Sequence, residues 1–159
     1  MRVSVIPFVC SLTAGVAVTF VGASAASDAS PVAYRSQLNA LCRVNTPEFV
    51  KLESEIGTAS KTGDSARVFR DLGFAVALTL RQDAAIEDAP VPREIRESIA
   101  PALRLLRRSD SYLRAATAKA LNNDVTGLLQ EIRKAGALDK PINKALDASG
   151  LQDCGSNQA

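Results

Sequence analysis

Two cysteines, Cys42 and Cys154, most constrain what this chain can fold into, because a bond between them would tie the two ends of the folded region together. The chain has 3 cysteines, and the other one, Cys10, lies in an apolar N-terminal segment that we expect to be removed on export. An even pair left in an oxidising compartment predicts one disulfide. Two free thiols, or a bridge to a second molecule, are the alternatives. A loop of this length would stabilise the fold by about 4–5 kcal/mol in the chain-entropy description.

The N-terminal segment has the three parts of a secretory signal peptide. Arg2 supplies a short basic start, and no charged side chain occurs in residues 3–27, of which the first part is strongly apolar. Small residues follow, with Ala23 and Ala25 at the positions that signal peptidase reads. Residues 1–25 are therefore predicted to be a signal peptide that is cut off before the mature chain.

The remaining residues, 26–159, are predicted to form a single extracytoplasmic domain, either secreted or periplasmic. An uncleaved anchor is the alternative, since about 20 apolar residues can span a bilayer. Cys10 does not follow a lipobox, so a lipid anchor is not expected. The 19 basic and 17 acidic residues nearly balance, which gives no electrostatic reason to expect nucleic acid or an anionic membrane as partner. No apolar run after the signal peptide is long enough for a transmembrane helix.

The pattern of apolar residues after the signal peptide is helical. Apolar side chains recur at steps of three and four, and alternating strand-like runs bounded by Asn-Gly turns are missing. The period predicts four helical stretches, at residues 31–60, 64–89, 95–121 and 125–148. Asp64 is predicted to cap the second stretch, Asn123 or Asp124 to cap the fourth, and Gly150 to end it. The apolar side chains predicted to face the core include Leu72, Val76, Leu80, Leu128 and Ile132. Pro47 predicts a kink in the first stretch, and Pro101 predicts a bend or a late start in the third. Gly136 and Pro141 leave open whether the fourth stretch is one helix or two.

Short turns between these stretches predict an all-α fold, an up-down-up-down four-helix bundle with kinked helices and one disulfide. In that topology the start of the first helix and the end of the fourth lie at the same end of the bundle. Cys42 and Cys154 are placed where they would have to meet for the disulfide to form. The topology and the cysteine count are independent observations that lead to the same fold.

The sequence lacks the residues that most enzymes and cofactor sites need. It contains no histidine, which removes the commonest general base and most zinc, haem and di-iron sites. It also has no glycine-rich phosphate loop and no Gly-x-Ser-x-Gly elbow. We therefore expect no enzymatic activity, no catalytic residue, no metal and no cofactor.

An acidic cluster occurs at the end of the second stretch. Asp83, Glu87 and Asp88 lie near the negative end of the helix dipole, where carboxylates are locally unfavourable. A loose calcium site is one interpretation. Ion pairs with Arg93 or Arg96 across the following turn are the interpretation that we favour.

The third stretch is rich in arginine. Arg104, Arg107, Arg108 and Arg114 form a weak candidate for a surface that faces an anionic partner, such as an envelope polymer or lipid headgroups. Acidic residues are interspersed, and Asp110 lies at pairing distance from Arg107 and Arg114. A solvated face is the interpretation that we favour.

Four short segments resemble a loose group of uncharacterised exported or lipid-anchored helical domains from actinobacteria. They are the Leu-Asn-Ala-Leu-Cys segment ending at Cys42, the Pro-Val-Pro break at residues 90–92, Asn-Asp at residues 123–124, and the Ser-Gly-Leu-Gln-Asp-Cys segment ending at Cys154. The resemblance implies a helical domain, a disulfide and an extracytoplasmic location. It implies no activity, binding site or partner.

Two functions remain open at this point. The first is a non-enzymatic module for protein interaction or envelope structure, which predicts a tightly packed monomer without a cavity and an unknown protein or envelope component as its partner. The alternative is a carrier that holds an apolar small molecule or lipid between its helices. The carrier is indicated by small residues that leave space in a bundle: Gly73, Ala75, Ala77, Ala102, Ala116, Ala120 and Gly127. The same residues would also allow close packing of helices, and the close approach of a neighbouring helix is the reason that we favour for Gly73.

Overall fold

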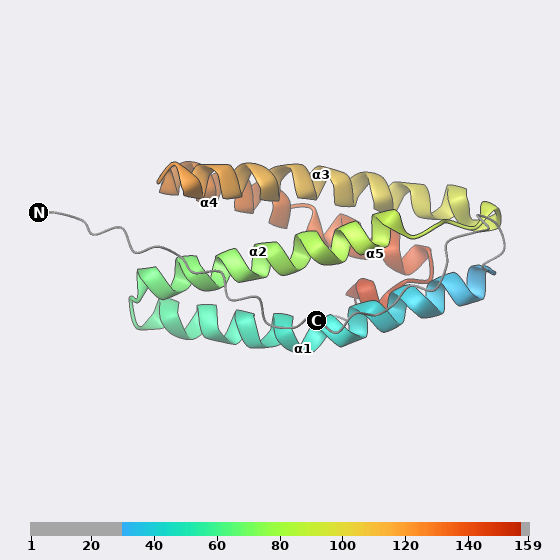
Figure 1. Cartoon of the computed structure of the whole chain (residues 1–159), viewed down its shortest axis with the longest axis horizontal. Coiled ribbons are helices and arrows are strands. Elements are labelled where there is room, and N and C mark those ends of the chain that lie inside the picture. The colour runs from blue at the N-terminus through green and yellow to red at the C-terminus, as the bar shows by residue number, and fades with distance from the viewer. Residues whose placement is uncertain (1–29, 157–159) are drawn as a thin grey trace, which may run out of the picture.

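The computed structural model describes residues 30–156, and within this range the chain forms helices and no strand (Figure 1). The α-helices are α1 (Pro31–Lys61), α2 (Ser65–Asp88), α3 (Arg96–Leu121), α4 (Val125–Gly136) and α5 (Asp139–Ala148), with 3-10 turns η1 (Arg93–Ile95) and η2 (Gln152–Cys154). Helices α1, α2 and α3 run up, down and up, and α4 and α5 together return along α3. The predicted all-α bundle is confirmed, whereas the signal peptide lies outside the described residues.

Helix α1 is a single helix that continues through Pro47. Ser30 caps its start by accepting a hydrogen bond from the backbone N–H of Ala33 at 3.2 Å. Pro47 has no N–H to give to the carbonyl of Arg43, but both residues are exposed and water can bind that carbonyl. The expected continuation of the first stretch in one direction is therefore confirmed.

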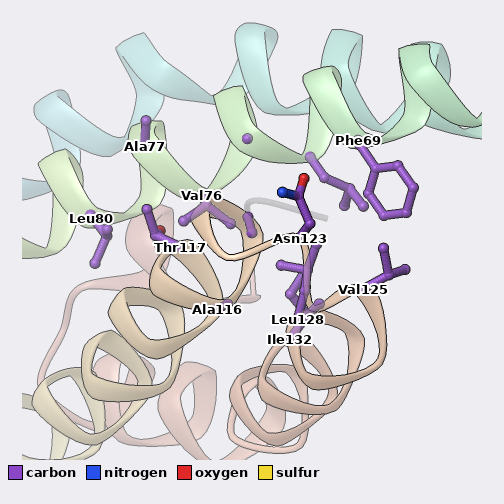
Figure 2. Close-up of a pocket in the computed structure, with 13 residues that line it drawn as sticks. Phe69, Val76, Ala77, Leu80, Ala116, Thr117, Asn123, Val125, Leu128 and Ile132 are labelled. Carbon is purple, nitrogen blue, oxygen red and sulfur yellow. The ribbon is translucent and has the colours of Figure 1, made fainter. Parts of the chain in front are cut away.

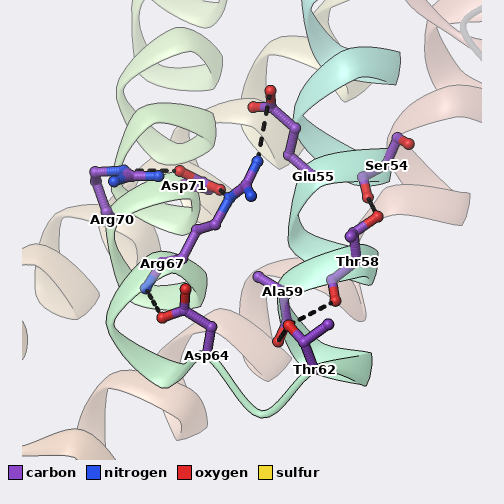
Figure 3. Close-up of polar contacts among 9 residues, drawn as sticks. All are labelled: Ser54, Glu55, Thr58, Ala59, Thr62, Asp64, Arg67, Arg70 and Asp71. Atoms are coloured by element: carbon purple, nitrogen blue, oxygen red, sulfur yellow. Dashed lines mark hydrogen bonds and ion pairs between the residues drawn. The ribbon is translucent and has the colours of Figure 1, made fainter.

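Helix α2 folds back on α1 through a short turn that polar contacts hold in place (Figure 3). Asp64 caps α2, as predicted, by accepting from the backbone N–H of Arg67 at 3.0 Å. The guanidinium of Arg67 lies 3.4 Å from the buried carboxylate of Asp71 and 3.9 Å from that of Glu55 on α1. Because Arg67 contacts carboxylates on both helices, it links α1 and α2 near their turn.

Helix α3 starts before Pro101 and passes through it. The Pro90–Pro92 segment ends α2 as predicted, and α3 follows the short turn η1. The late start that Pro101 allowed is not found, because Pro101 and Glu97, whose carbonyl loses its partner, are both exposed to water.

The fourth stretch consists of two helices, which answers the question left open by the sequence. Helix α4 ends at Gly136, a poor helix former, and Pro141 lies in the first turn of α5, where its missing N–H needs no partner. Asp124 caps α4 by accepting from the N–H of Gly127 at 2.9 Å. A left-handed Gly150, at φ 80°, ends α5 and turns the chain towards α1.

The hydrophobic core lies at the end of the bundle that carries the disulfide. Its buried members come from every helix except α4: Tyr34, Leu38, Cys42, Ile86, Ile95, Ile99, Ala102, Leu106, Ile142, Leu146, Leu151 and Cys154. The predicted disulfide between Cys42 and Cys154 is present, with Cα atoms 5.1 Å apart. Asn39 of α1 adds two hydrogen bonds across the same contact, donating to the carbonyl of Gly150 and accepting from the N–H of Asp153. The C-terminal turn is therefore tied firmly to the middle of α1.

Candidate functional site

At the opposite end of the bundle, an apolar groove of about 460 Å³ separates α2 from α4, with α3 as its floor (Figure 2). Helix α2 packs against α1 and α3, and α4 packs against α3. The lining residues are Phe69, Leu72, Gly73, Val76, Ala77, Leu80, Ala116, Thr117, Ala120, Asn123, Val125, Leu128 and Ile132. The bundle consists of two helical hairpins, one formed by α1 and α2 and the other by α3 with α4 and α5. The two hairpins pack around a core at one end and leave the groove between them at the other.

Large apolar side chains line this groove without being buried. Leu72, Val76 and Leu80 on α2, and Leu128 and Ile132 on α4, remain only half-buried. The sequence predicts all five as inward core residues, and they do point inward, but between α2 and α4 no side chain fills the space. A half-buried apolar wall of this kind gains stability when another apolar group covers it.

Small residues leave space in the groove, and for Gly73 the reason differs from the one expected. Gly73 and Ala77 on α2, and Ala116 and Ala120 on α3, each recur at a four-residue step and line the groove. The close approach of a neighbouring helix, expected at Gly73, is wrong, because a Cβ atom there would meet nothing within 4 Å.

The other small residues named in the sequence do not line the groove. Ala102 is fully buried in the core at the disulfide end. Gly127 is required by the cap of α4, since a Cβ atom there would collide with the carboxylate of Asp124. Ala75 is half-buried on α2 and is not part of the lining.

Two of the lining residues are polar, and none is charged. The hydroxyl of Thr117 donates to the carbonyl of Leu113 at 3.1 Å, so it is occupied within α3. Asn123, at the turn between α3 and α4, directs its amide toward α2 (Figure 2). Its φ of 56° is a left-handed conformation that asparagine adopts more readily than most residues. The groove therefore offers one free amide and an otherwise apolar surface.

A pair of buried carboxyl groups connects α2 with α3 beyond the groove. Asp83 on α2 is 5% exposed and Asp110 on α3 is 6% exposed. The two buried carboxyl groups face each other across α2 and α3, close enough for each to change the pKa of the other. The guanidinium of Arg114 lies 3.6 Å from one oxygen of the Asp110 carboxylate. One proton shared between the two carboxyls removes the repulsion of two like charges in a buried site.

Burial is the main reason why both carboxyls of this pair have a raised pKa. It raises the pKa of Asp83 to about 8, and the hydrogen bond to Asp110 and the negative charges of Asp110, Glu87 and Asp139 act in the same direction. Burial also raises the pKa of Asp110, against the opposing effects of the Asp83 hydrogen bond and of Arg114. Two like charges in one buried contact cannot both ionise at low free-energy cost.

The ion pairs expected for the acidic cluster are wrong. Glu87 binds Arg107 of α3 at 2.9 Å, Asp83 faces Asp110, and Asp88 is exposed, so neither Arg93 nor Arg96 is a partner. The reason is that α2 and α3 are antiparallel neighbours, which brings arginines several turns along α3 closer than those in the connecting turn. Residues 30–156 contain no group of three or more acidic or cysteine side chains placed to hold a metal ion.

All four arginines of the candidate anion-facing surface are exposed on α3. Arg107 binds Glu87, Arg114 binds Asp110, and the guanidinium of Arg108 lies 5.9 Å from the ring centre of Tyr112. The expected contact of Asp110 with Arg114 is found, whereas Arg107 binds Glu87 instead. Three of these arginines thus contact groups of their own chain.

Comparison with known proteins gives no relative, since no family model, no curated protein and no solved structure matches this chain. Among the helices in residues 30–156, none combines the length and the apolarity needed to cross a bilayer.

Proposed function

We propose that this domain is a non-enzymatic, exported binding protein that holds an apolar small molecule, such as a single lipid chain, in the groove between α2, α3 and α4. The observation that carries this proposal is the groove of about 460 Å³ walled by half-buried Leu, Val, Ile and Phe side chains. Of the two functions left open by the sequence, only the carrier requires such a space.

The size and chemistry of the groove support a small occupant. Sites for small molecules typically have about 300–1,000 Å³ and apolar walls with few polar groups. Each methylene group buried in such a site contributes about 0.8 kcal/mol. A hydrocarbon chain lying along α2 would cover Leu72, Val76 and Leu80 in turn, and Asn123 would offer its amide to a polar group attached to it.

A module for protein interaction is the second candidate, because exposed large apolar side chains lie on the same three helices. Phe74 of α2 is 59% exposed, Leu121 at the end of α3 is 80% exposed, and Leu129 of α4 is also exposed. Exposed apolar groups on neighbouring elements are typical of contact surfaces. A protein partner would cover exposed side chains of this kind, whereas a small molecule in the groove would leave them in water.

The export proposal rests on the predicted signal peptide and agrees with the Cys42–Cys154 disulfide, since disulfides persist in oxidising compartments. The absence of enzymatic activity rests on the chain having no histidine and on the lack of any charged group in the groove. The mature domain is proposed to act as a monomer.

Titration with N-phenyl-1-naphthylamine, an uncharged apolar dye that fluoresces when it leaves water, tests the proposal. We expect saturable binding to the native protein, and at least about tenfold weaker binding by Ala120→Phe, because the ring would occupy the space that a ligand needs. Ala118→Phe is the matched control: this residue is exposed on the same helix but does not line the groove. Native mass spectrometry of protein purified from the exporting cell should show an added mass that disappears on denaturation.

Equal dye binding by Ala120→Phe and Ala118→Phe would rule out the groove as the binding site. Absence of saturable binding to the native protein would leave the interaction module as the better proposal. In that case, substitution of Phe74 or Leu121 by serine should abolish capture of the protein partner.

A further inference from the structure

The carboxyl pair lies directly beyond the inner end of the groove. On α2, Asp83 follows the lining residue Leu80 by three positions and therefore lies on the same face of the helix. On α3, Asp110 lies six positions before the lining residue Ala116, with Leu113 between them. The next layer in the same direction contains Ile86 and Leu106 of the main core. The pair is thus placed between the hollow half of the bundle and the packed half.

The pair is also a polar link between the two hairpins, since α2 belongs to one and α3 to the other. The charged groups that act on it are Glu87 of α2, which binds Arg107, together with Arg114 of α3 and Asp139 at the start of α5. On the α1 side, the neighbouring Gln82 is neutral and accepts a hydrogen bond from Asn45 at 2.9 Å. Three negative groups therefore act on Asp83, and the two nearby cations bind other carboxylates: Arg107 binds Glu87 and Arg114 binds Asp110.

We propose that Asp83 and Asp110 couple the groove to pH: while they share a proton they hold α2 against α3 and the groove binds its apolar ligand, and when both are ionised the two helices separate and the ligand is released. This inference rests on the proposed function of the groove. It assigns a role to a buried carboxyl pair whose repulsion, once both groups are ionised, would oppose the packing of α2 on α3.

The physical basis is that the interaction between the two carboxyls changes from attractive to repulsive when the shared proton is lost. With a proton, the pair forms a charge-assisted hydrogen bond in a site screened from water. Without that proton, two carboxylates face each other in the same buried site, and Glu87 and Asp139 add to the repulsion. The charges gain hydration only if α2 moves away from α3, and the residue one turn earlier on this face of α2 is Leu80, a wall of the groove. Because linkage is reciprocal, a bound ligand that holds α2 in place must also raise the proton affinity of the pair.

The test measures the affinity for N-phenyl-1-naphthylamine at about pH 6 and at about pH 9, on either side of the titration of the pair. The dye itself is uncharged in this range, so its own ionisation does not contribute. For the native protein we expect at least about fivefold weaker binding at the higher pH, the lower limit of a typical coupling. Asp83→Asn should bind equally at both pH values, because an amide donates a hydrogen bond to Asp110 without ionising. Asp88→Asn, an exposed neighbour on the same helix, should keep the native dependence.

Three results would overturn the inference, and they differ from a failure of the proposed function. If the native protein binds the dye equally at both pH values, or if Asp83→Asn weakens in parallel with it, the groove is not coupled to the pair. If the native protein binds no dye at any pH, the proposed function fails first. Should Asp83→Asn not fold, Asp110→Asn takes its place in the same measurement. The carboxyl ¹³C resonances of labelled aspartate report the titration of Asp83 directly. If a bound ligand does not raise the pH at which Asp83 titrates, the coupling is contradicted.

Discussion

At the scale of single residues, glycine serves two different purposes in this chain, and the two make opposite predictions. Gly73 lies in an exposed turn of α2 with no atom within 4 Å of the position of a Cβ. Gly127 lies in the first turn of α4, where a Cβ would displace the capping carboxylate of Asp124. Open space explains the first glycine and a cap explains the second.

Gly73→Ala should therefore stabilise the protein by about 0.5–1 kcal/mol, because alanine has the better helix propensity and nothing opposes its methyl group. Gly127→Ala should show no such gain, since the lost cap of about 1 kcal/mol offsets it. Urea unfolding of both variants measures the two free energies. A loss of stability in Gly73→Ala would mean that a neighbouring helix does approach that position.

The pH dependence of stability should reveal Asp83. Its pKa is about 8 in the folded state and 3.8 in the unfolded state, so between these values the unfolded chain ionises and the folded chain does not. The stabilising contribution of the protonated group is complete below about pH 4, falls as the pH rises, and is lost above about pH 8. Between about pH 4 and about pH 8, the free energy of unfolding of Asp83→Asn should therefore rise by at least about 1 kcal/mol relative to that of the native protein. Urea unfolding at a series of pH values checks this, and a difference that does not vary with pH would contradict it.

At the scale of elements, proline inside a helix does not end the helix in this structure. Pro47 and Pro101 both lie inside α-helices, and both helices continue because the orphaned carbonyls face water. The real break in the second half of the chain follows Gly136, where α4 ends and α5 begins. The helix ends there because Gly136 has a low helix propensity and because α5 changes direction to pack against the core.

Replacement of Pro47 tests the continuity of α1. Pro47→Ala restores the backbone hydrogen bond to the carbonyl of Arg43 and relieves the ring clash, so we expect a gain of about 1–2 kcal/mol, reduced by the greater freedom of the unfolded chain. Thermal unfolding followed by circular dichroism at the helix band measures it. Glu48→Ala, next to it and also exposed, is the control. A destabilised Pro47→Ala would show that α1 needs a bend at this position.

At the scale of the whole molecule, the bundle is asymmetric along its length. The disulfide end has a packed apolar core, a covalent link and hydrogen bonds from Arg35 and Asn39 to the C-terminal turn. The other end has capped turns and a groove. The stabilising contacts of the bundle are therefore concentrated at the end opposite the groove.

Removing the disulfide should therefore act unequally on the two ends. The Cys42→Ser, Cys154→Ser double variant should lose up to about 4–5 kcal/mol of stability. Amide hydrogen exchange should rise most in residues 149–156, which lie against α1, and least in the α3–α4 turn. A uniform rise along the chain would show instead that the bundle unfolds as one unit.

How much was predictable follows from the range of each interaction. The helices, the cap at Asp64 and the end of α5 at Gly150 depend on residues within one turn, and the sequence predicts them correctly. For the cap of α4 the sequence allows Asn123 or Asp124, and the structure has Asp124. The contact of Asp83 with Asp110 and that of Glu87 with Arg107 depend on the register of α2 against α3. Helical period does not determine that register, so the pairing predicted with Arg93 or Arg96 is wrong.

The sequence by itself determined that the chain forms antiparallel helices held by one disulfide, because helical period, local caps and an even cysteine pair are properties of short segments and of composition. Only the tertiary structure decided that Leu72, Val76, Leu128 and Ile132 line a groove rather than a filled core. The physical reason is that an apolar stripe specifies which face turns inward, whereas the distance between two stripes depends on every side chain packed along both hairpins.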